Sequence, residues 1–188
     1  GERAPVDPVT GSLAIGKPYP GVEVRVLNPA GEPLGPREHG ELEITGPSIV
    51  PGYWRNEEAT ARTMPGGRLR TGDGAMVDED GWVYIVDRLK DQINTSGYKV
   101  WPREVEDVLT RHDAVHQVAV VGEPDDYRGE AVVAHVVLVP GASAGPEELV
   151  AFARERLAAY KVPRRVVLTD ALPTTATGKI QRRALRGT

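Results

Sequence analysis

The first half of the chain alternates apolar with polar residues. Residues 22–26 (VEVRV) place valine at every second position, and residues 40–45 (GELEIT) repeat this period. Such alternation is typical of half-buried strands. The apolar stretches 75–77 and 82–86 flank the turn sequence DEDG and predict a hairpin. We therefore expect a mostly antiparallel, barrel-like sheet in this half.

A short helix is predicted between these strands, over NEEATARTM at residues 56–64. Asn56 suits the N-cap position, because its side chain can accept a hydrogen bond from a free backbone amide. Glu57 and Glu58 would then lie in the first turn, where the positive end of the helix dipole favours acidic side chains.

The period changes in the second half of the chain. Pro102 and Pro146 each begin a stretch with helical spacing, over residues 102–112 and 146–160. Proline is tolerated in the first turn of a helix because the missing amide would have had no partner there. Apolar residues of the first stretch recur on one stripe, which predicts an amphipathic helix.

Three apolar runs in the same half predict strands, at residues 115–122, 130–139 and 165–169. We expect these elements to form a compact domain of about a hundred residues. The predicted fold class is α+β: an antiparallel β-barrel-like subdomain, then a small α+β domain with a central, mainly antiparallel sheet. The junction falls near Asp87 to Asp91, where charged residues interrupt the apolar pattern.

Composition limits the possible locations. The 188 residues are 40% hydrophobic and 27% charged without a long apolar run, which predicts no transmembrane segment. Residues 1–11 lack the basic start and apolar stretch of a signal peptide. Cysteine is absent, which excludes disulfides and thiolate chemistry. These observations favour a cytoplasmic protein.

Charge argues against a nucleic-acid partner. The formal net charge of −4 gives no general attraction for polynucleotides. We interpret the arginines of the last segment as solvated surface: Arg164, Arg165, Arg182, Arg183 and Arg186.

Three stretches could carry chemistry. Asp73 follows a glycine in LRTGDGA, at the expected end of a strand or turn. A carboxylate there can accept two hydrogen bonds from a vicinal diol such as that of ribose, although Thr-Gly-Asp alone equally fits an ordinary turn. Gly97, in a loop of small residues with Ser96, either lets a ligand approach the backbone or only supplies a permitted backbone angle.

The third stretch is PTTATGKIQRRALR, at residues 173–186. Lys179 lies there in a loop of small hydroxyl residues, which we expect to be flexible and to be followed by a basic helix. Its ammonium could reach a phosphate as a mobile point charge. By itself, a Gly-Lys pair is more often a solvent-exposed lysine without a catalytic role.

In this order, the motifs RTGD, R-x-K-D with a following glycine loop and P-x-E-V-E, and P-x-x-x-x-G-K-I-x-R-R resemble the closing motifs of the adenylate-forming superfamily. That superfamily includes acyl-CoA synthetases, nonribosomal peptide adenylation domains and beetle luciferases. The resemblance covers essentially the whole chain. The stretches GSLAIGKPYPGVEVRV and GELEITGPSIVPGYW resemble the barrel subdomain of those enzymes.

The resemblance implies a reaction in two steps. A carboxylate attacks the α-phosphate of ATP to give an acyl-adenylate and pyrophosphate, and a thiol, such as that of coenzyme A, then takes the acyl group. Lys179 matches the family's catalytic lysine, which stabilises charge at the α-phosphate electrostatically. Asp73 matches the acid that binds the ribose hydroxyls. Arg88 matches an arginine near the same ribose and phosphate, where a fork of donors suits oxygen ligands.

The resemblance also implies domain movement. In such enzymes a small C-terminal domain swings between an orientation for adenylation and one for thioester formation. Lys90 matches the hinge residue, and Gly97 matches the position that lines the channel for the pantetheine arm of coenzyme A. The implied organisation is a β-rich terminal subdomain of the large N-terminal domain over 1–87, a hinge over 88–91 and a mobile C-terminal domain over 92–188.

The family's phosphate loop, and the motif that supplies a magnesium ligand, are not found in this sequence. We therefore expect the chain to be part of a longer enzyme, inactive without the missing N-terminal part. The substrates would be ATP, coenzyme A and a carboxylic acid, and magnesium would be bound outside this chain. Asp87 stands where many relatives have glycine, which leaves the geometry of that turn open.

The general likeness of SGYKVWPREVEDVL and the residues after it favours a fatty or medium-chain acyl-CoA synthetase, an acid–CoA ligase. One alternative is an adenylation enzyme that loads a carrier protein, and another is a noncatalytic module that keeps the fold. The joint presence of Asp73, Arg88, Gly97 and Lys179 favours an enzyme. Lys179 could also be a site of regulatory acylation, which would remove its charge.

Other residues carry weaker signals. His39, His112, His116 and His135 are scattered without the spacing of metal ligands, and we interpret them as surface or satisfied, partly buried histidines. Trp101 could stack on the adenine of coenzyme A, although packing beneath the start of a helix is the favoured interpretation.

Overall fold

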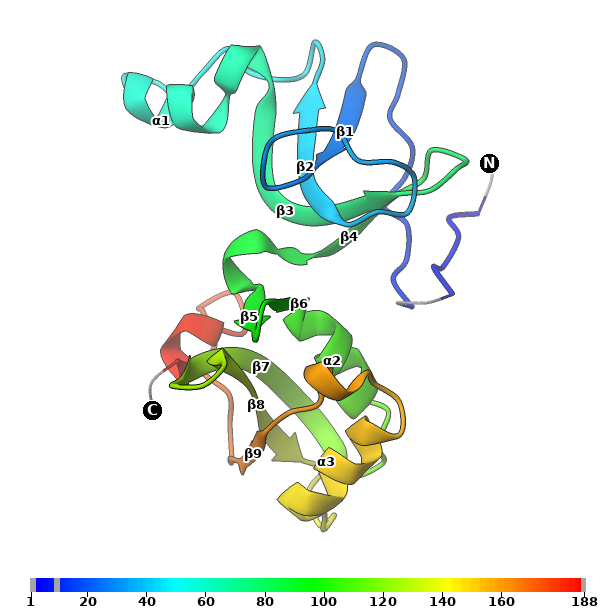
Figure 1. Cartoon of the computed structure of the whole chain (residues 1–188), viewed down its shortest axis with the longest axis vertical. Coiled ribbons are helices and arrows are strands. Elements are labelled where there is room, and N and C mark those ends of the chain that lie inside the picture. Colours follow the sequence, from blue (N-terminus) through cyan, green and yellow to red (C-terminus); the bar gives the residue numbers. More distant parts are fainter. Residues whose placement is uncertain (1–2, 9–10, 187–188) are drawn as a thin grey trace. The chain divides into compact units, whose positions relative to one another are not determined.

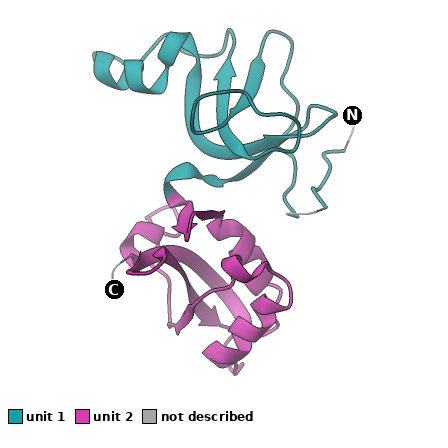
Figure 2. Cartoon of the chain, in the orientation of Figure 1, with its two compact units in different colours: residues 1–90 teal, residues 91–188 magenta. Residues whose placement is uncertain are grey.

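The computed structural model describes residues 3–8 and 11–186. The chain divides into two compact units, residues 1–90 and residues 91–188 (Figure 2). Each unit has its own sheet and its own buried core. The fold is α+β with antiparallel sheets, as the sequence predicts.

The first unit is built on a four-stranded antiparallel sheet with the order β1-β2-β3-β4 (Figure 1). Its strands are Glu23–Leu27 (β1), Gly40–Thr45 (β2), Leu69–Val77 (β3) and Val83–Arg88 (β4). Leu42, Ala75 and Val83 form the centre of one buried cluster on this sheet. In the described residues β1 and β4 do not pair, so the sheet is open rather than a closed barrel.

The helix of the first unit forms where the cap predicts it. Helix α1 spans Glu57–Thr63, and the Asn56 side-chain oxygen accepts a hydrogen bond from the amide of Ala59 at 2.9 Å. A short 3-10 turn follows at Pro65–Gly67 (η1). No residue of α1 is buried. Capping and charge placement, rather than an apolar stripe, therefore account for this helix.

The second unit has a five-stranded sheet. Its strands are Ile93–Thr95 (β5), Tyr98–Val100 (β6), Val115–Asp125 (β7), Gly129–Leu138 (β8) and Arg165–Leu168 (β9). The order β6-β5-β8-β7 is antiparallel throughout, and β9 pairs with β8 in parallel. The prediction of a central, mainly antiparallel sheet is confirmed.

Two helices cover one face of this sheet (Figure 1). They are Pro102–Leu109 (α2) and Pro146–Arg154 (α3). The shared core is apolar and includes Val105, Leu109, Val120, Val136 and Leu149. The opposite face packs against the end of the chain, where Leu172 and Leu185 contact Ala119, Val121, Val133 and Val137.

Helix α3 is shorter than the predicted 146–160. The amides of Arg156 and Leu157 both donate to the Ala153 carbonyl, which tightens and closes the last turn. The chain then forms a separate 3-10 turn at Ala159–Lys161 (η3). There Tyr160 stacks on Tyr98 with ring centroids 4.6 Å apart, so a tertiary contact overrides the helical propensity of the preceding alanines.

Two further short turns replace expected loops or helices. Residues Leu89–Asp91 form a 3-10 turn (η2) at the junction of the two units. The expected basic helix near the C-terminus is a single 3-10 turn, Arg182–Leu185 (η4).

Candidate functional site

Asp73 and Arg88, the two residues expected to bind nucleotide, lie opposite each other on β3 and β4. The Nε atom of Arg88 is 2.7 Å from the Oδ1 atom of Asp73, and the two side chains are 58% and 25% exposed. The pair combines a carboxylate, which can accept hydroxyl hydrogen bonds, with a more than half-exposed arginine side chain that has N–H donors besides Nε. This arrangement can bind a diol beside an anionic group.

A β-bulge sets this pairing. The register shifts by one residue between Gly74 and Ala75. An unshifted register would place Asp73 opposite Asp87, and two carboxylates that face each other repel. The bulge instead places Asp73 opposite Arg88, so the extra residue re-aims the side chain as bulges near functional sites often do.

Asp73 lies within strand β3 rather than at the expected end of a strand or turn. The turn-like character of Thr-Gly-Asp survives inside the strand, because Gly72 has φ of 71° and the Thr71 hydroxyl accepts a hydrogen bond from the Asp73 amide at 3.1 Å. The same hydroxyl donates to the Leu42 carbonyl at 2.9 Å. The backbone that carries Asp73 is therefore held on both sides.

Asp87 is buried and its Oδ1 atom accepts a hydrogen bond from the Arg88 amide at 2.8 Å. The carboxylate thus closes a local loop on the residue that it precedes. The sequence alone did not show how the turn accommodates an aspartate at position 87, where many relatives have glycine. In the structure the Asp87 side chain caps the backbone of the next residue. Lys90, the expected hinge residue, follows in η2 as an exposed side chain and the last residue of the first unit.

Gly97 lies in a two-residue hairpin turn between β5 and β6, where Thr95 pairs with Tyr98. Ser96 and Gly97 have φ of 51° and 83°, as the twist of a tight hairpin requires. A Cβ atom added at Gly97 would meet nothing within 4 Å. The turn therefore presents bare backbone to its surroundings, and Tyr98 beside it is exposed.

Lys179 lies at the end of a short hydrogen-bonded turn. Thr174 and Ile180 form an antiparallel bridge, and the Thr175 amide donates to the Lys179 carbonyl at 2.8 Å. The Gly178 amide donates back to the Thr175 carbonyl at 2.9 Å. The Lys179 side chain is exposed. These main-chain hydrogen bonds order the backbone, while the ammonium remains exposed.

The histidines and Trp101 do not form a metal or ligand site in the part of the chain that the structure describes. Across residues 3–8 and 11–186, no three His, Cys, Asp or Glu side chains gather as metal ligands do. Trp101 is buried, in agreement with packing beneath the start of α2. His135 departs from the expected satisfied histidine, because it is buried and its Nε2 atom has no hydrogen-bond partner within the described chain.

Among the helices described, none is long and apolar enough to span a bilayer.

The chain is similar to known proteins over most of its length. The model of the AMP-binding enzyme C-terminal domain matches residues 104–179, and the AMP-binding enzyme model matches residues 4–54. A long-chain-fatty-acid–CoA ligase of Bacillus subtilis (strain 168) is 49% identical over 92% of this chain and 31% of its own length. A feruloyl-CoA synthase of Amycolatopsis sp is 44% identical over 98% of this chain and 37% of its own length.

A fatty acid–[acyl-carrier-protein] ligase, ScoC of Streptomyces coeruleorubidus, is 43% identical over 94% of this chain and 34% of its own length. Among solved structures, ATP-bound MatB from Rhodopseudomonas palustris superposes with a TM-score of 0.87 at 36% identity, covering 92% of this chain and 35% of that one. The chain therefore spans about a third of the length of the proteins that it matches.

Proposed function

Because this chain belongs to the AMP-binding enzyme family of adenylate-forming enzymes, we propose that it forms the C-terminal portion of an ATP-dependent acid–CoA ligase. The intact enzyme joins a carboxylate to the α-phosphate of ATP with release of pyrophosphate. The thiol of coenzyme A then attacks the acyl carbonyl, forms the thioester and releases AMP. The chain by itself is proposed to be inactive, since it spans about a third of its relatives' length.

The pairing of Asp73 with Arg88 is the observation that carries this proposal. The two side chains come from adjacent strands and meet at 2.7 Å, with the Arg88 side chain more than half exposed. In the proposed role Asp73 accepts hydrogen bonds from the ribose hydroxyls of ATP, and Arg88 faces the ribose and phosphate. Hydrogen bonds to charged groups are stronger than neutral ones, so a single carboxylate can contribute measurably to nucleotide binding.

Lys179 has the proposed catalytic role in the first step. Charge accumulates at the α-phosphate as a second anion, the carboxylate, approaches it. A positioned ammonium stabilises that charge more in the transition state than in the ground state, which lowers the barrier. The hydrogen-bonded turn around Lys179 supports this role, because an ordered backbone reduces the cost of placing the ammonium.

The second step is proposed to use the hairpin turn between β5 and β6 in the same unit. Gly97 presents open backbone with no room taken by a side chain, which suits passage of the pantetheine arm. Lys90 at the boundary of the units is the proposed hinge, with few residues absorbing the dihedral change. Magnesium would neutralise phosphate charge when bound, and we propose that its ligands lie in the part of the enzyme outside this chain.

The acid is proposed to be a fatty acid, on the 49% identity to a long-chain-fatty-acid–CoA ligase. The feruloyl-CoA synthase at 44% identity makes an aromatic acid the competing substrate class. A second candidate function is loading of a carrier protein instead of coenzyme A, which the ScoC ligase supports at 43% identity. The proposed location is the cytoplasm, on the absence of cysteine.

One experiment tests these proposals together. The intact enzyme is given ATP, magnesium, coenzyme A and a panel of aliphatic and aromatic carboxylates, and products are identified by mass spectrometry. Acyl-CoA supports the ligase proposal and identifies the substrate class. Acyl-adenylate without thioester shifts the assignment to carrier-protein loading, and no activation of any acid favours a noncatalytic module. The 188-residue chain alone should give no product, and turnover by it would overturn the proposed inactivity.

A further inference from the structure

The segment that follows Lys179 is held to the second unit by a bidentate ion pair. The Nε and Nη2 atoms of Arg182 lie 2.9 Å and 2.6 Å from the two carboxylate oxygens of Glu106 on α2. The side chains are 21% and 14% exposed. Parallel hydrogen bonds between a guanidinium and a carboxylate fix direction as well as distance. The contact therefore fixes the orientation of η4 relative to α2, in addition to neutralising the charge of Arg182.

The same carboxylate reaches the edge of the sheet. Glu106 Oε1 also accepts a hydrogen bond from the amide of Val120 in β7 at 2.8 Å. The other end of the guanidinium faces Asp91, with Arg182 Nη1 at 3.7 Å from Oδ2. Arg186 Nη2 is 3.6 Å from Oδ1 of Asp91. We refer to Asp91, Glu106, Arg182 and Arg186 as the ionic clasp.

The ionic clasp lies close to Lys179 along the backbone. Only Ile180 and Gln181 separate Lys179 from Arg182. The Gln181 amide donates to the Pro173 carbonyl at 2.8 Å, which closes the base of the Lys179 turn. Leu172 before the turn and Leu185 after it are both buried against the sheet. Arg182 therefore fixes the side of the turn that contains Lys179.

We propose that Arg182 is a positioning residue for Lys179, acting through its bidentate pair with Glu106 to hold the lysine turn in the geometry that adenylation needs. The inference rests on the proposed catalytic role of Lys179. Arg182 does not contact substrate in this role. Asp91, the first residue of the second unit, joins the same ionic clasp, so the lysine turn is tied to the residue directly after Lys90 and moves with it.

The half-reactions of the intact enzyme test this role. Arg182→Ala should slow acyl-adenylate formation about 10- to 100-fold, the size of effect that a misplacement of about 1 Å can produce. Thioester formation from supplied acyl-adenylate should stay within about twofold of wild type, because that step does not use the lysine turn. A variant that is merely less stable would lose both steps together.

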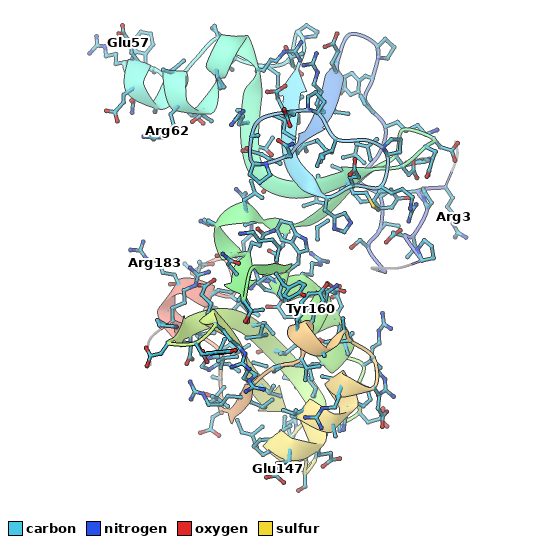
Figure 3. All side chains as sticks on the ribbon, in the orientation of Figure 1. Arg3, Glu57, Arg62, Glu147, Tyr160 and Arg183 are labelled. Atoms are coloured by element: carbon cyan, nitrogen blue, oxygen red, sulfur yellow. The ribbon has the colours of Figure 1, made fainter. Side chains whose placement is uncertain are left out.

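Matched variants separate position from charge. Arg183 is the neighbouring residue, exposed and directed outward from the C-terminal segment (Figure 3), and Arg183→Ala should leave both steps unchanged. Arg182→Lys keeps the charge but loses the planar fork, so it should restore only part of the adenylation rate. Adenylation at the wild-type rate in both Arg182 variants would overturn the proposal. An inactive wild-type enzyme would instead contradict the proposed function.

Hydrogen exchange on the 188-residue chain gives a second readout that needs no activity. The amides of Thr175 and Gln181 report the lysine turn, since they donate to Lys179 and Pro173. In Arg182→Ala and in Glu106→Gln, their exchange should accelerate by about tenfold or more, because local opening sets the exchange rate. The double variant should add little to either single one. Unchanged exchange at these amides would contradict positioning by the ionic clasp.

Discussion

Asp73 faces Arg88 across the β3–β4 hairpin. This pairing results from a one-residue shift in register, between Gly74 and Ala75, on the side of the pair nearer the turn. The 2.7 Å contact between Nε and Oδ1 therefore depends on the bulge and not only on the identity of the two residues. A one-residue slip flips a strand's side chains to the other face of the sheet. Restoring the regular register would separate the pair and remove the proposed nucleotide site.

Asp73→Ala in the intact enzyme should weaken ATP binding by about 1.5 to 3 kcal/mol, the usual size for hydrogen bonds to a charged group. Isothermal titration calorimetry with ATP measures the change. Asp80→Ala removes an exposed carboxylate from the nearby turn and should leave the affinity unaltered. Because Asp73 and Arg88 are in contact, the effects of removing both should not add. An unchanged affinity in Asp73→Ala would remove this residue from the site.

Lys179→Ala should reduce acyl-adenylate formation about 100- to 1,000-fold, as the loss of one donor to a developing oxyanion does in other enzymes. Pyrophosphate release measures this step. Thioester formation from supplied acyl-adenylate should persist. Arg111→Ala removes another exposed cation of the same unit and should spare both steps. Equal loss of both steps in Lys179→Ala would refute the assignment of this lysine to adenylation.

Gly97→Leu should show the opposite pattern, with loss of thioester formation and retention of acyl-adenylate formation. The side chain would enter the space that is open beside Gly97. The substitution also strains the backbone, since φ at Gly97 is 83°. Gly81→Leu is the matched control, because Gly81 has φ of 81° and equally open surroundings in the β3–β4 turn. Thioester loss of equal size in both variants would indicate strain and not obstruction.

Stability should fall with acid through His135. Burial lowers the pKa of His135 below its ordinary value; the field of Arg165 acts in the same direction, and Glu123 opposes it. Above about pH 6.5, the ordinary pKa of histidine, the side chain is neutral in both states and adds no pH dependence. Below that pH the unfolded chain binds a proton that the folded one does not, so the free energy of unfolding decreases.

Thermal unfolding of the 188-residue chain between pH 7.5 and pH 5.5 measures this dependence. His135→Gln should flatten the fall in melting temperature that accompanies acidification. His116→Gln is the control, since His116 is exposed on the same sheet, and it should keep the wild-type slope. The same slope in wild type and His135→Gln would show that other groups control the acid dependence.

Much of the fold could be predicted from local pattern. The alternation at residues 40–45 matches β2 residue for residue, and the Asn56 cap predicted the start of α1. The hairpin of β5 and β6 was not predicted, because each strand has three residues and Asn94 and Lys99 are exposed. The feature of the sequence that could have predicted this hairpin is the Ser96-Gly97 pair, which lies between two short stretches that contain β-branched and aromatic residues.

The contacts of the candidate site could not be predicted from the sequence. The motif around Asp73 marked an acid, yet the regular count from the turn would have paired it with Asp87 rather than with Arg88. A bulge depends on the packing of both strands, so periodicity alone cannot reveal it. The pairing of Arg182 with Glu106 joins residues 76 positions apart, and only the tertiary fold brings them together.

The ionic clasp has a consequence for the behaviour of the isolated unit in solution. Strand β7 has 11 residues and is an edge strand of its sheet. A long edge strand with unpaired backbone groups promotes aggregation, because it can pair with a strand of another molecule. Glu106 occupies the Val120 amide near the middle of that edge, and Pro124 offers no amide near its end. The contact that positions Lys179 therefore also protects the protein against intermolecular sheet extension, and loss of Glu106 should promote self-association.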